Sequence, residues 1–253
     1  MREIPAQLVS GFDIVVHLSG ESVAGRWTEG KKSRIRDSRI RSTDHLAQAL
    51  AKAEKRAATF ICASAIGYYG NRGEETLTEE SLSGDGFLPE VCREWEFATG
   101  TASDTGIRTV NLRTGIVLSA RGGALKQMLL PFRLGLGGKI GDGHQWWSWI
   151  HIDDFVAAVQ WIVQHTQIGG PVNMTAPNPV TNAEFTKTLA GVLKRPAVLP
   201  VPGFAAKLAF GDFAREGLLA SARVVPKKLV EAGFQFRCPE ITQALVHLQH
   251  KNA

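Results

Sequence analysis

The sequence has few cysteines, no long apolar run and only a small excess of positive charge. Each of these features excludes a class of protein. The three cysteines among 253 residues, Cys62, Cys92 and Cys238, are far apart and never spaced as C-x-x-C, so no disulfide framework is predicted and a reducing compartment is favoured. No apolar run reaches the roughly 18 residues of a membrane span, and the first residues lack the apolar core of a signal peptide. We expect a cytoplasmic protein without a membrane partner.

The charge balance indicates no large anionic partner. Lysine and arginine number 29 against 24 aspartates and glutamates, for a net charge of +5, an excess too small to indicate nucleic-acid binding by itself. The one dense basic segment, residues 31–41, contains six basic residues and one acidic residue. Because no aromatic side chain is interleaved with them to stack on bases, we interpret the segment as a solvated helix face and expect no nucleic-acid partner.

A glycine-rich turn is missing from the start of the chain. Residues 12–20 form an apolar run that closes on small residues, which is typical of a buried parallel strand that delivers its end to a ligand. Nothing in residues 1–11 matches the G-x-G-x-x-G turn that opens a dinucleotide-binding sheet. Either the sheet does not bind a nucleotide, or it lacks its first unit.

Strands and helices alternate along the rest of the chain. Further strands are predicted at residues 59–64, 109–114, 146–152 and 171–175. Helical patterns occur at residues 46–51, 88–102, 122–134, 155–165, 182–194 and 239–249. Thr181-Asn-Ala-Glu184 has the spacing of a capping box that opens the helix ending near residue 194. Residues 71–86 are rich in turn formers and acids, and predict a surface loop. This alternation indicates an α/β fold with a mostly parallel sheet.

Several strings in the sequence together resemble one family. They are His17-Leu-Ser-Gly-Glu21, Gly25-Arg-Trp27, Asp37-Ser-Arg39 with Thr43, Ser64-Ala-Ile-Gly-Tyr-Tyr-Gly70, Arg113-Thr-Gly-Ile-Val117, Leu130-Pro-Phe-Arg-Leu-Gly-Leu-Gly-Gly138 and Trp149-Ile-His-Ile-Asp-Asp154. The chain resembles the epimerase-like subgroup of atypical short-chain dehydrogenase/reductases, whose members carry a C-terminal lobe of unassigned function and are in some cases labelled cell-division inhibitors.

The resemblance implies a fold, a cofactor and a division of the chain. Residues 1–195 would form a Rossmann-like NAD(P)-binding domain with a parallel sheet, and residues 196–253 a small α+β lobe. The cofactor would be NADP or NAD, with NADP slightly favoured, and the partner a small-molecule substrate of unknown identity. A homo-oligomer stays compatible with the sequence.

The resemblance also defines what the chain lacks relative to the family. Family members open with a strand and a G-G-x-G-x-x-G turn, and this chain starts after roughly the first 50 residues of that pattern. Because that turn supplies the backbone N–H groups and the helix dipole that hold a pyrophosphate, we expect these 253 residues to bind NAD(P) poorly. Exposed strand edges would also make the chain prone to aggregation.

The resemblance places candidate cofactor-binding residues at strand ends. They are Leu18, Ser19, Gly20, Arg39, Thr114 and Val117. The backbone of the first three would lie against the adenosine and phosphates, Arg39 would contact phosphate or adenine through its guanidinium, and the last two would approach the nicotinamide. The alternatives are tight turns with nothing bound and, for Arg39, a solvated helix face.

The usual proton-transfer pair of the family's extended relatives is absent. Those reductases use Tyr-x-x-x-Lys, in which the tyrosine exchanges the proton and the lysine positions the ribose. Counting back from Trp95-Glu96 places these two positions on Leu88 and Cys92, neither of which can do that chemistry. The sequence therefore predicts no proton transfer by this pair.

Three other residues are candidate catalytic groups. Ser64 ends a predicted strand where related reductases use a serine to polarise the substrate carbonyl, although alignment on Tyr69-Gly70 places Ala65 there. Tyr68 or Tyr69 would replace the missing acid, or pack with its hydroxyl at a rim. Three hypotheses follow: an NAD(P)-dependent oxidoreductase or epimerase, a non-catalytic cofactor-binding or regulatory protein, and a truncated inactive copy.

No metal site is predicted. His151 with Asp153 and Asp154 has the composition of an acid/base or metal cluster, but Asp153 is expected to cap a helix and His151 to be a core histidine. The remaining histidines show no metal-ligand spacing.

Overall fold

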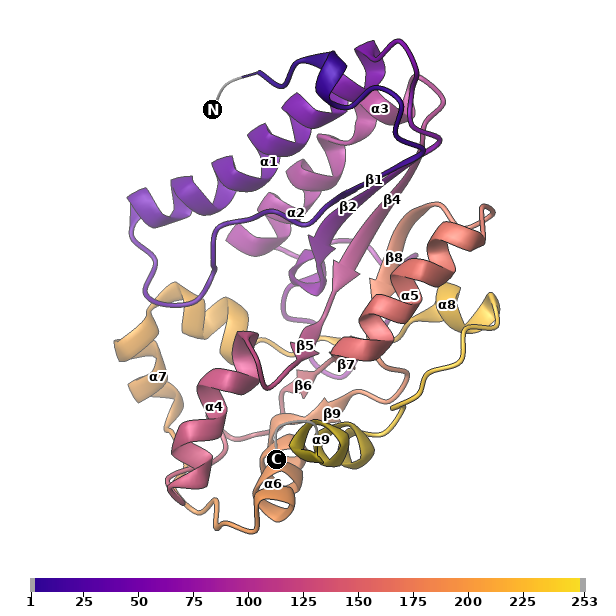
Figure 1. Cartoon of the computed structure of the whole chain (residues 1–253). Coiled ribbons are helices and arrows are strands. Elements are labelled where there is room, and N and C mark those ends of the chain that lie inside the picture. Colours follow the sequence, from indigo (N-terminus) through magenta and orange to yellow (C-terminus); the bar gives the residue numbers. More distant parts are fainter. Residues whose placement is uncertain (1–2, 251–253) are drawn as a thin grey trace.

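The centre of the molecule is a four-stranded parallel sheet (Figure 1). The computed structural model describes residues 3–250. Its central strands are β1 (Ile14–His17), β2 (Thr59–Ala65), β4 (Arg108–Thr114) and β8 (Gly170–Met174), paired in the order β1-β2-β4-β8. Neighbours on both sides bury most of β2 and β4. The sequence of β2 is accordingly a nearly continuous apolar run, whereas β4 also buries the polar side chains of Asn111 and Arg113. The predicted α/β fold with a Rossmann-like parallel sheet is confirmed.

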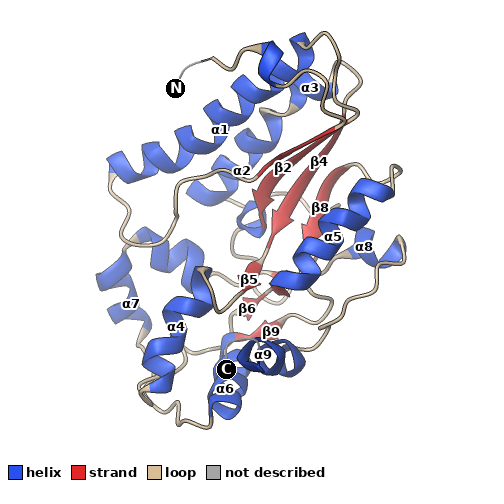
Figure 2. Ribbon diagram, in the orientation of Figure 1, coloured by secondary structure: helices blue, strands red, loops and turns tan. Residues whose placement is uncertain are grey.

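Helices cover both faces of this sheet (Figure 2). On one face lie α1 (Glu29–Lys52), α2 (Phe87–Phe97) and α3 (Gly100–Ser103), and on the other α5 (Ile152–Gln164) and α8 (Lys227–Glu231). The basic segment 31–41 lies within the first turns of α1 and forms ion pairs with acidic side chains around it. No helix within residues 3–250 is both long and apolar enough to cross a membrane.

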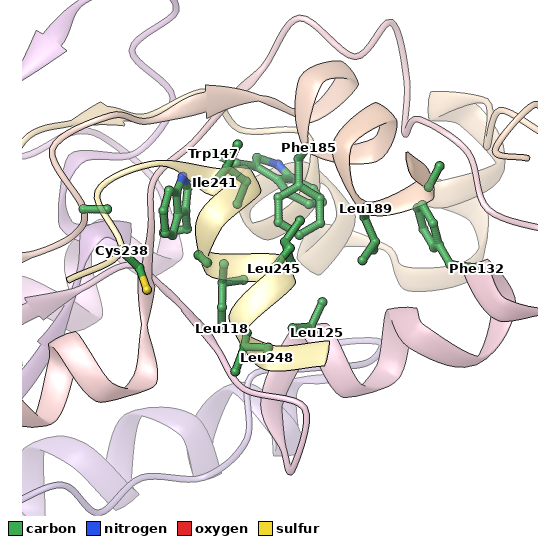
Figure 3. Close-up of a cluster of buried hydrophobic side chains, with 14 residues drawn as sticks. Leu118, Leu125, Phe132, Trp147, Phe185, Leu189, Cys238, Ile241, Leu245 and Leu248 are labelled. Atoms are coloured by element: carbon green, nitrogen blue, oxygen red, sulfur yellow. The ribbon is translucent and has the colours of Figure 1, made fainter. Parts of the chain in front are cut away.

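A second layer lies beyond the carboxyl ends of the sheet. Two short pairs, β5 (Ile116–Leu118) with β7 (Trp149–His151) and β6 (Trp146–Trp147) with β9 (Val180–Thr181), support the helices α4 (Gly123–Arg133), α6 (Asn182–Leu193) and α9 (Ile241–His250). Figure 3 shows the apolar cluster that these elements enclose. The capping box predicted from Thr181 and Glu184 starts α6: the Thr181 hydroxyl accepts from the Glu184 N–H and the Glu184 carboxylate accepts from the Thr181 N–H.

The chain after residue 195 packs against elements of both layers. It forms α7 (Gly203–Phe210), a π-helix (Ala214–Leu218), β10 (Arg223–Val224), α8 and α9. Strand β10 pairs with β3 (Thr76–Leu77), α8 packs on β8, and α9 packs on α6. The remaining elements are two 3-10 helices, Ala6–Leu8 and Ile66–Tyr69. A division between residues 195 and 196 stays a prediction.

Three local expectations are wrong, one of them because the pairing partner lies far away in the sequence. The helix expected at 88–102 is broken into α2 and α3. The loop expected at 71–86 contains β3, with Leu77 fully buried, because its pairing partner β10 lies about 150 residues later. The N-cap of α5 is His151 instead of Asp153: the His151 ring accepts a 3.1 Å hydrogen bond from the Asp153 N–H.

Candidate functional site

A pocket of about 300 Å³ lies at the carboxyl ends of β2 and β4. This is the edge of a parallel sheet at which ligands bind in open α/β folds. Its walls come from strand ends, from α2, from the Trp146–Trp147 strand and from the segment around the π-helix. A larger hollow of about 950 Å³ lies between α6 and α9, but none of its lining residues comes from the central sheet.

Arg39 and the turn after β1 are brought together beside this pocket. Arg39 lines the pocket, and its Nη1 donates hydrogen bonds to the carbonyls of Glu21 (2.9 Å) and Ile35 (3.1 Å). A Cβ placed on Gly20 would lie 3.1 Å from the Arg39 Cζ, so glycine permits this close approach. The guanidinium also lies 5.0 Å from the Trp95 ring centroid. The predicted cofactor residues Leu18, Ser19 and Gly20 therefore form an exposed turn next to Arg39.

The other two predicted cofactor residues lie on consecutive strands. Thr114, at the end of β4, lines the pocket and donates its hydroxyl to the Leu112 carbonyl at 3.0 Å. Val117 lies in β5, where it pairs with Ile150 of β7. Thr114 thus has direct access to a ligand in the pocket, while Val117 supports the neighbouring wall.

The predicted catalytic residues belong to a buried network around one ion pair. Arg113 donates from Nε and Nη2 to the two carboxylate oxygens of Glu96, at 2.8 and 2.9 Å. Ser64 donates to the same carboxylate at 2.7 Å. Arg113 also donates to the Tyr69 hydroxyl at 3.1 Å, and that hydroxyl donates to Oδ1 of Asn173 at 2.7 Å. Such bidentate, charge-assisted contacts fix the side chains in one geometry.

The hydroxyl groups of Ser64 and Tyr69 both form hydrogen bonds within this network. Their exposed fractions are 3% and 0%, and burial, opposed by Arg113, raises the pKa of Tyr69 to about 12. Tyr68 is half-buried, with the Arg113 guanidinium 3.5 Å from its ring centroid. Ala65 lines the pocket in the place expected for the carbonyl-polarising serine. A catalytic role for the serine and the tyrosines stays a prediction.

The positions of the usual tyrosine and lysine do face the pocket. Leu88 and Cys92 both line it, and a Cβ on Gly67 would lie 3.3 Å from Leu88 Cβ and 3.9 Å from Cys92 Sγ. Burial raises the pKa of Cys92 to about 12, so the thiol stays neutral at physiological pH. An apolar side chain and a neutral thiol therefore replace the proton-transfer pair.

Glu216 lines the pocket but is not among the site residues predicted from the sequence. Glu216, in the π-helix, is the one acidic side chain among the described residues that line the pocket. Its Oε2 accepts a 2.9 Å hydrogen bond from the Leu88 N–H, at a helix start whose N-cap, Gly86, has no side chain to offer. A carboxylate is favoured there by the free N–H groups and by the helix dipole. Because 128 residues separate Glu216 from Leu88, no local pattern predicts the contact.

Comparison with known families assigns the chain. The NAD dependent epimerase/dehydratase family profile matches residues 2–175, most of the chain. The chain belongs to this family. A domain of unknown function (DUF1731) matches residues 201–248. This combination, with the relatives below, places it among the epimerase-like, atypical short-chain dehydrogenase/reductases.

Named relatives of this epimerase-family chain are found in bacteria and animals. It is 44% identical over 244 residues to the epimerase family protein Mb2239 of Mycobacterium bovis, covering 96% of this chain and 80% of that protein. It is 35% identical over 247 residues to the epimerase family protein SDR39U1 of Homo sapiens, covering 96% and 84%.

Solved structures agree with the epimerase-family fold. The crystal structure of human SDR39U1 (isoform 2) with NADPH superposes with a TM-score of 0.89 at 33% identity, over 96% of this chain and 85% of that chain. A nucleoside-diphosphate sugar epimerase from Corynebacterium glutamicum superposes with a TM-score of 0.78 at 42% identity, over 97% of this chain and 48% of that chain.

Proposed function

We propose that this chain binds NADP(H) along the carboxyl edge of its sheet and exchanges hydride between the nicotinamide and a small substrate in the 300 Å³ pocket. The observation that carries the proposal is the packing of Arg39 against Gly20 at the pocket rim, which holds a positive charge beside an exposed turn. The NADPH in the crystal structure of human SDR39U1 supports the choice of cofactor.

The residues present fit such a cofactor in a definite order along the edge. The backbone of Leu18, Ser19 and Gly20 would contact adenosine and phosphate, because exposed main-chain groups follow β1 there. Arg39 would contact the 2′-phosphate or the adenine, since a planar guanidinium suits both. Thr114 would approach the nicotinamide, with Val117 behind it.

Affinity for the cofactor is expected to be low. The strongest anion site in these folds is the start of a helix that follows a glycine-rich turn. Within residues 3–250, α1 begins at a Thr28 cap that accepts from the Lys31 N–H, and the start of α2 is filled by the Glu216 carboxylate. Arg39 therefore supplies much of the phosphate attraction.

Proton transfer would need a group other than tyrosine and lysine at positions 88 and 92. Ser64, Tyr68 and Tyr69 are proposed for this role. Ser64 and Tyr69 must first leave their hydrogen bonds to Glu96 and Asn173, so Tyr68 is the more accessible of the tyrosines. The presence of Leu88 and Cys92 in the pocket favours a second candidate function, a cofactor-binding protein without catalysis.

Thermal unfolding with added dinucleotide tests the binding proposal. A ligand that binds only the folded state raises its melting temperature. We expect a rise with millimolar NADPH that is absent in Arg39→Ala and retained in Arg41→Ala, an exposed arginine of the same helix. A chain that shows no rise with NADPH or NADH does not bind the cofactor, and the proposal is then wrong.

Turnover distinguishes the two candidate functions. NADPH oxidation would be followed by its absorbance with a panel of small carbonyl compounds, in the wild type and in Tyr68→Phe. Oxidation that Tyr68→Phe abolishes supports hydride transfer with this tyrosine as the acid. Binding without oxidation of NADPH by any compound favours the non-catalytic function.

A further inference from the structure

Three side chains of metal-binding type meet outside the pocket. His151 ends β7, Cys238 precedes α9 and His247 lies on α9, and one ligand atom from each lies within 4.8 Å of the other two. Cys238 Sγ is 3.7 Å from His247 Nδ1, and the two imidazole rings are stacked with centroids 5.0 Å apart. His151 and Cys238 are buried and His247 is half-buried. In Figure 3, Cys238 lies at the opposite end of the apolar cluster from Phe132.

We propose that His151, Cys238 and His247 bind one divalent transition metal ion of the zinc class, with water as the fourth ligand. Tetrahedral coordination with Zn–S near 2.3 Å and Zn–N near 2.0 Å places sulfur and nitrogen about 3.5 Å apart. The 3.7 Å between Cys238 and His247 matches that spacing. A thiolate with two imidazoles favours zinc, cobalt or copper over magnesium and calcium, which prefer oxygen ligands.

Neighbouring carboxylates support the geometry of the cluster. Asp154 accepts hydrogen bonds from the N–H groups of Arg237 and Cys238, both at 2.9 Å, and so fixes the loop that carries the cysteine. The Asp153 carboxylate lies 3.8 Å from His151 Nδ1. A ligating histidine commonly donates its other ring N–H to a carboxylate, and Asp153 would serve as this acceptor if it moved within hydrogen-bond distance of Nδ1.

Binding requires one proton to leave and one to move. Cys238 loses its thiol proton when the sulfur–metal bond forms, so one proton is released per ion, and no group is oxidised or reduced. His151 Nδ1 now accepts from the Asp153 N–H. Coordination through Nε2 would place the ring proton on Nδ1, so the hydrogen bond from the Asp153 N–H would break and Nδ1 would instead donate to the Asp153 carboxylate. The ion would then tie α9 to the end of β7 and the start of α5.

Cobalt(II) is the probe for this site, because a cobalt–thiolate bond absorbs light that a cobalt–nitrogen or cobalt–oxygen site does not. The full chain, freed of metal with a chelator, would be titrated with Co²⁺. We expect about one ion per chain, a thiolate-to-cobalt charge-transfer band, and release of one proton per ion. Zn²⁺ should displace Co²⁺ and raise the melting temperature in a concentration-dependent way.

Variants identify the ligands. Cys238→Ser should lose the band, and His247→Gln should weaken Co²⁺ binding by at least 10-fold. Cys62→Ser changes a different buried cysteine, in β2, and should keep both band and affinity. Absence of the band in the wild type, or its persistence in Cys238→Ser, overturns the proposal. If Cys238→Ser fails to fold, His247→Gln decides: unchanged affinity overturns the site.

Discussion

Replacing Glu96 by glutamine should destabilise the fold far more than a typical surface change. The Glu96 carboxylate receives two hydrogen bonds from Arg113 and one from Ser64, and the two ionic side chains are only 13% and 4% exposed. Glutamine keeps the shape, but it removes the charge and turns one acceptor into a donor that faces the guanidinium. Breaking a buried pair in this way costs about 3–5 kcal/mol, because a buried charge is left uncompensated.

The assay is equilibrium unfolding in urea, read by two independent probes. Glu96→Gln should lower the midpoint without changing the slope of the transition. At about 2–4 °C per kcal/mol for a chain of this size, the melting temperature should fall by roughly 6–20 °C. The matched control is Glu90→Gln, which breaks an ion pair to Arg36 whose side chains are 49% and 43% exposed. That pair should be worth less than about 1 kcal/mol.

A double variant separates burial of charge from loss of packing. Glu96→Leu with Arg113→Met removes both charges, and apolar replacement of a buried pair is often neutral. The double variant should therefore be more stable than Glu96→Gln. A loss below about 1 kcal/mol in Glu96→Gln, similar to that of the Glu90 control, would refute the reasoning that this pair is effectively desolvated.

Four further outcomes follow from single contacts. The pKa of Tyr69 in the folded chain is raised to about 12, so its contribution to stability is complete below pH 10 and declines as the pH rises toward 12, by up to about 1.4 kcal/mol per pH unit. Tyr69→Phe should flatten this decline when the free energy of unfolding in urea is compared at each pH. An unchanged dependence of stability on pH would contradict the raised pKa of Tyr69. Burial raises the pKa of both Cys62 and Cys92 to about 12, so mass spectrometry should find neither alkylated in the folded chain at pH 8 and both alkylated in denaturant. Thr181→Ala removes a capping box and should cost about 1 kcal/mol in the same urea assay, whereas a neutral result would mean that the cap is not formed in solution. Glu216→Ala should cost a similar amount by exposing the start of α2, while Glu216→Gln, which keeps an acceptor for the Leu88 N–H, should recover most of it.

The central strands and several helices were predictable because their signals are local. The runs at 59–64 and 109–114 correspond to β2 and β4, and the Thr181 capping box starts α6 as expected. A buried parallel strand favours apolar residues, as in β2, and the capping box uses a hydroxyl and a carboxylate three residues apart, so each can be recognised within a few residues. The sequence strings shared with the family made it possible to predict the whole fold.

The candidate site was predictable only in part. Arg39, Gly20 and Thr114 were identified from family strings, and the structure places them around one pocket rim. The hydrogen bonds of Ser64 and Tyr69 depend on Glu96 and Asn173, 32 and 104 residues away. Whether a hydroxyl is available for chemistry or engaged in a network depends on such partners, which no local pattern reveals.

The α/β class, the parallel sheet, the family and the lack of the usual tyrosine–lysine pair could all be read from the amino-acid sequence, because residue types at short spacings carry them. Which distant side chains meet depends on the folded arrangement of the elements. It brought Glu216 to the start of α2, and it placed Cys238 and His247 beside His151, where spacing had predicted no metal site. The physical reason is that burying apolar surface brings elements together regardless of their order in the chain, so chemistry built from distant residues leaves no periodic trace in the sequence.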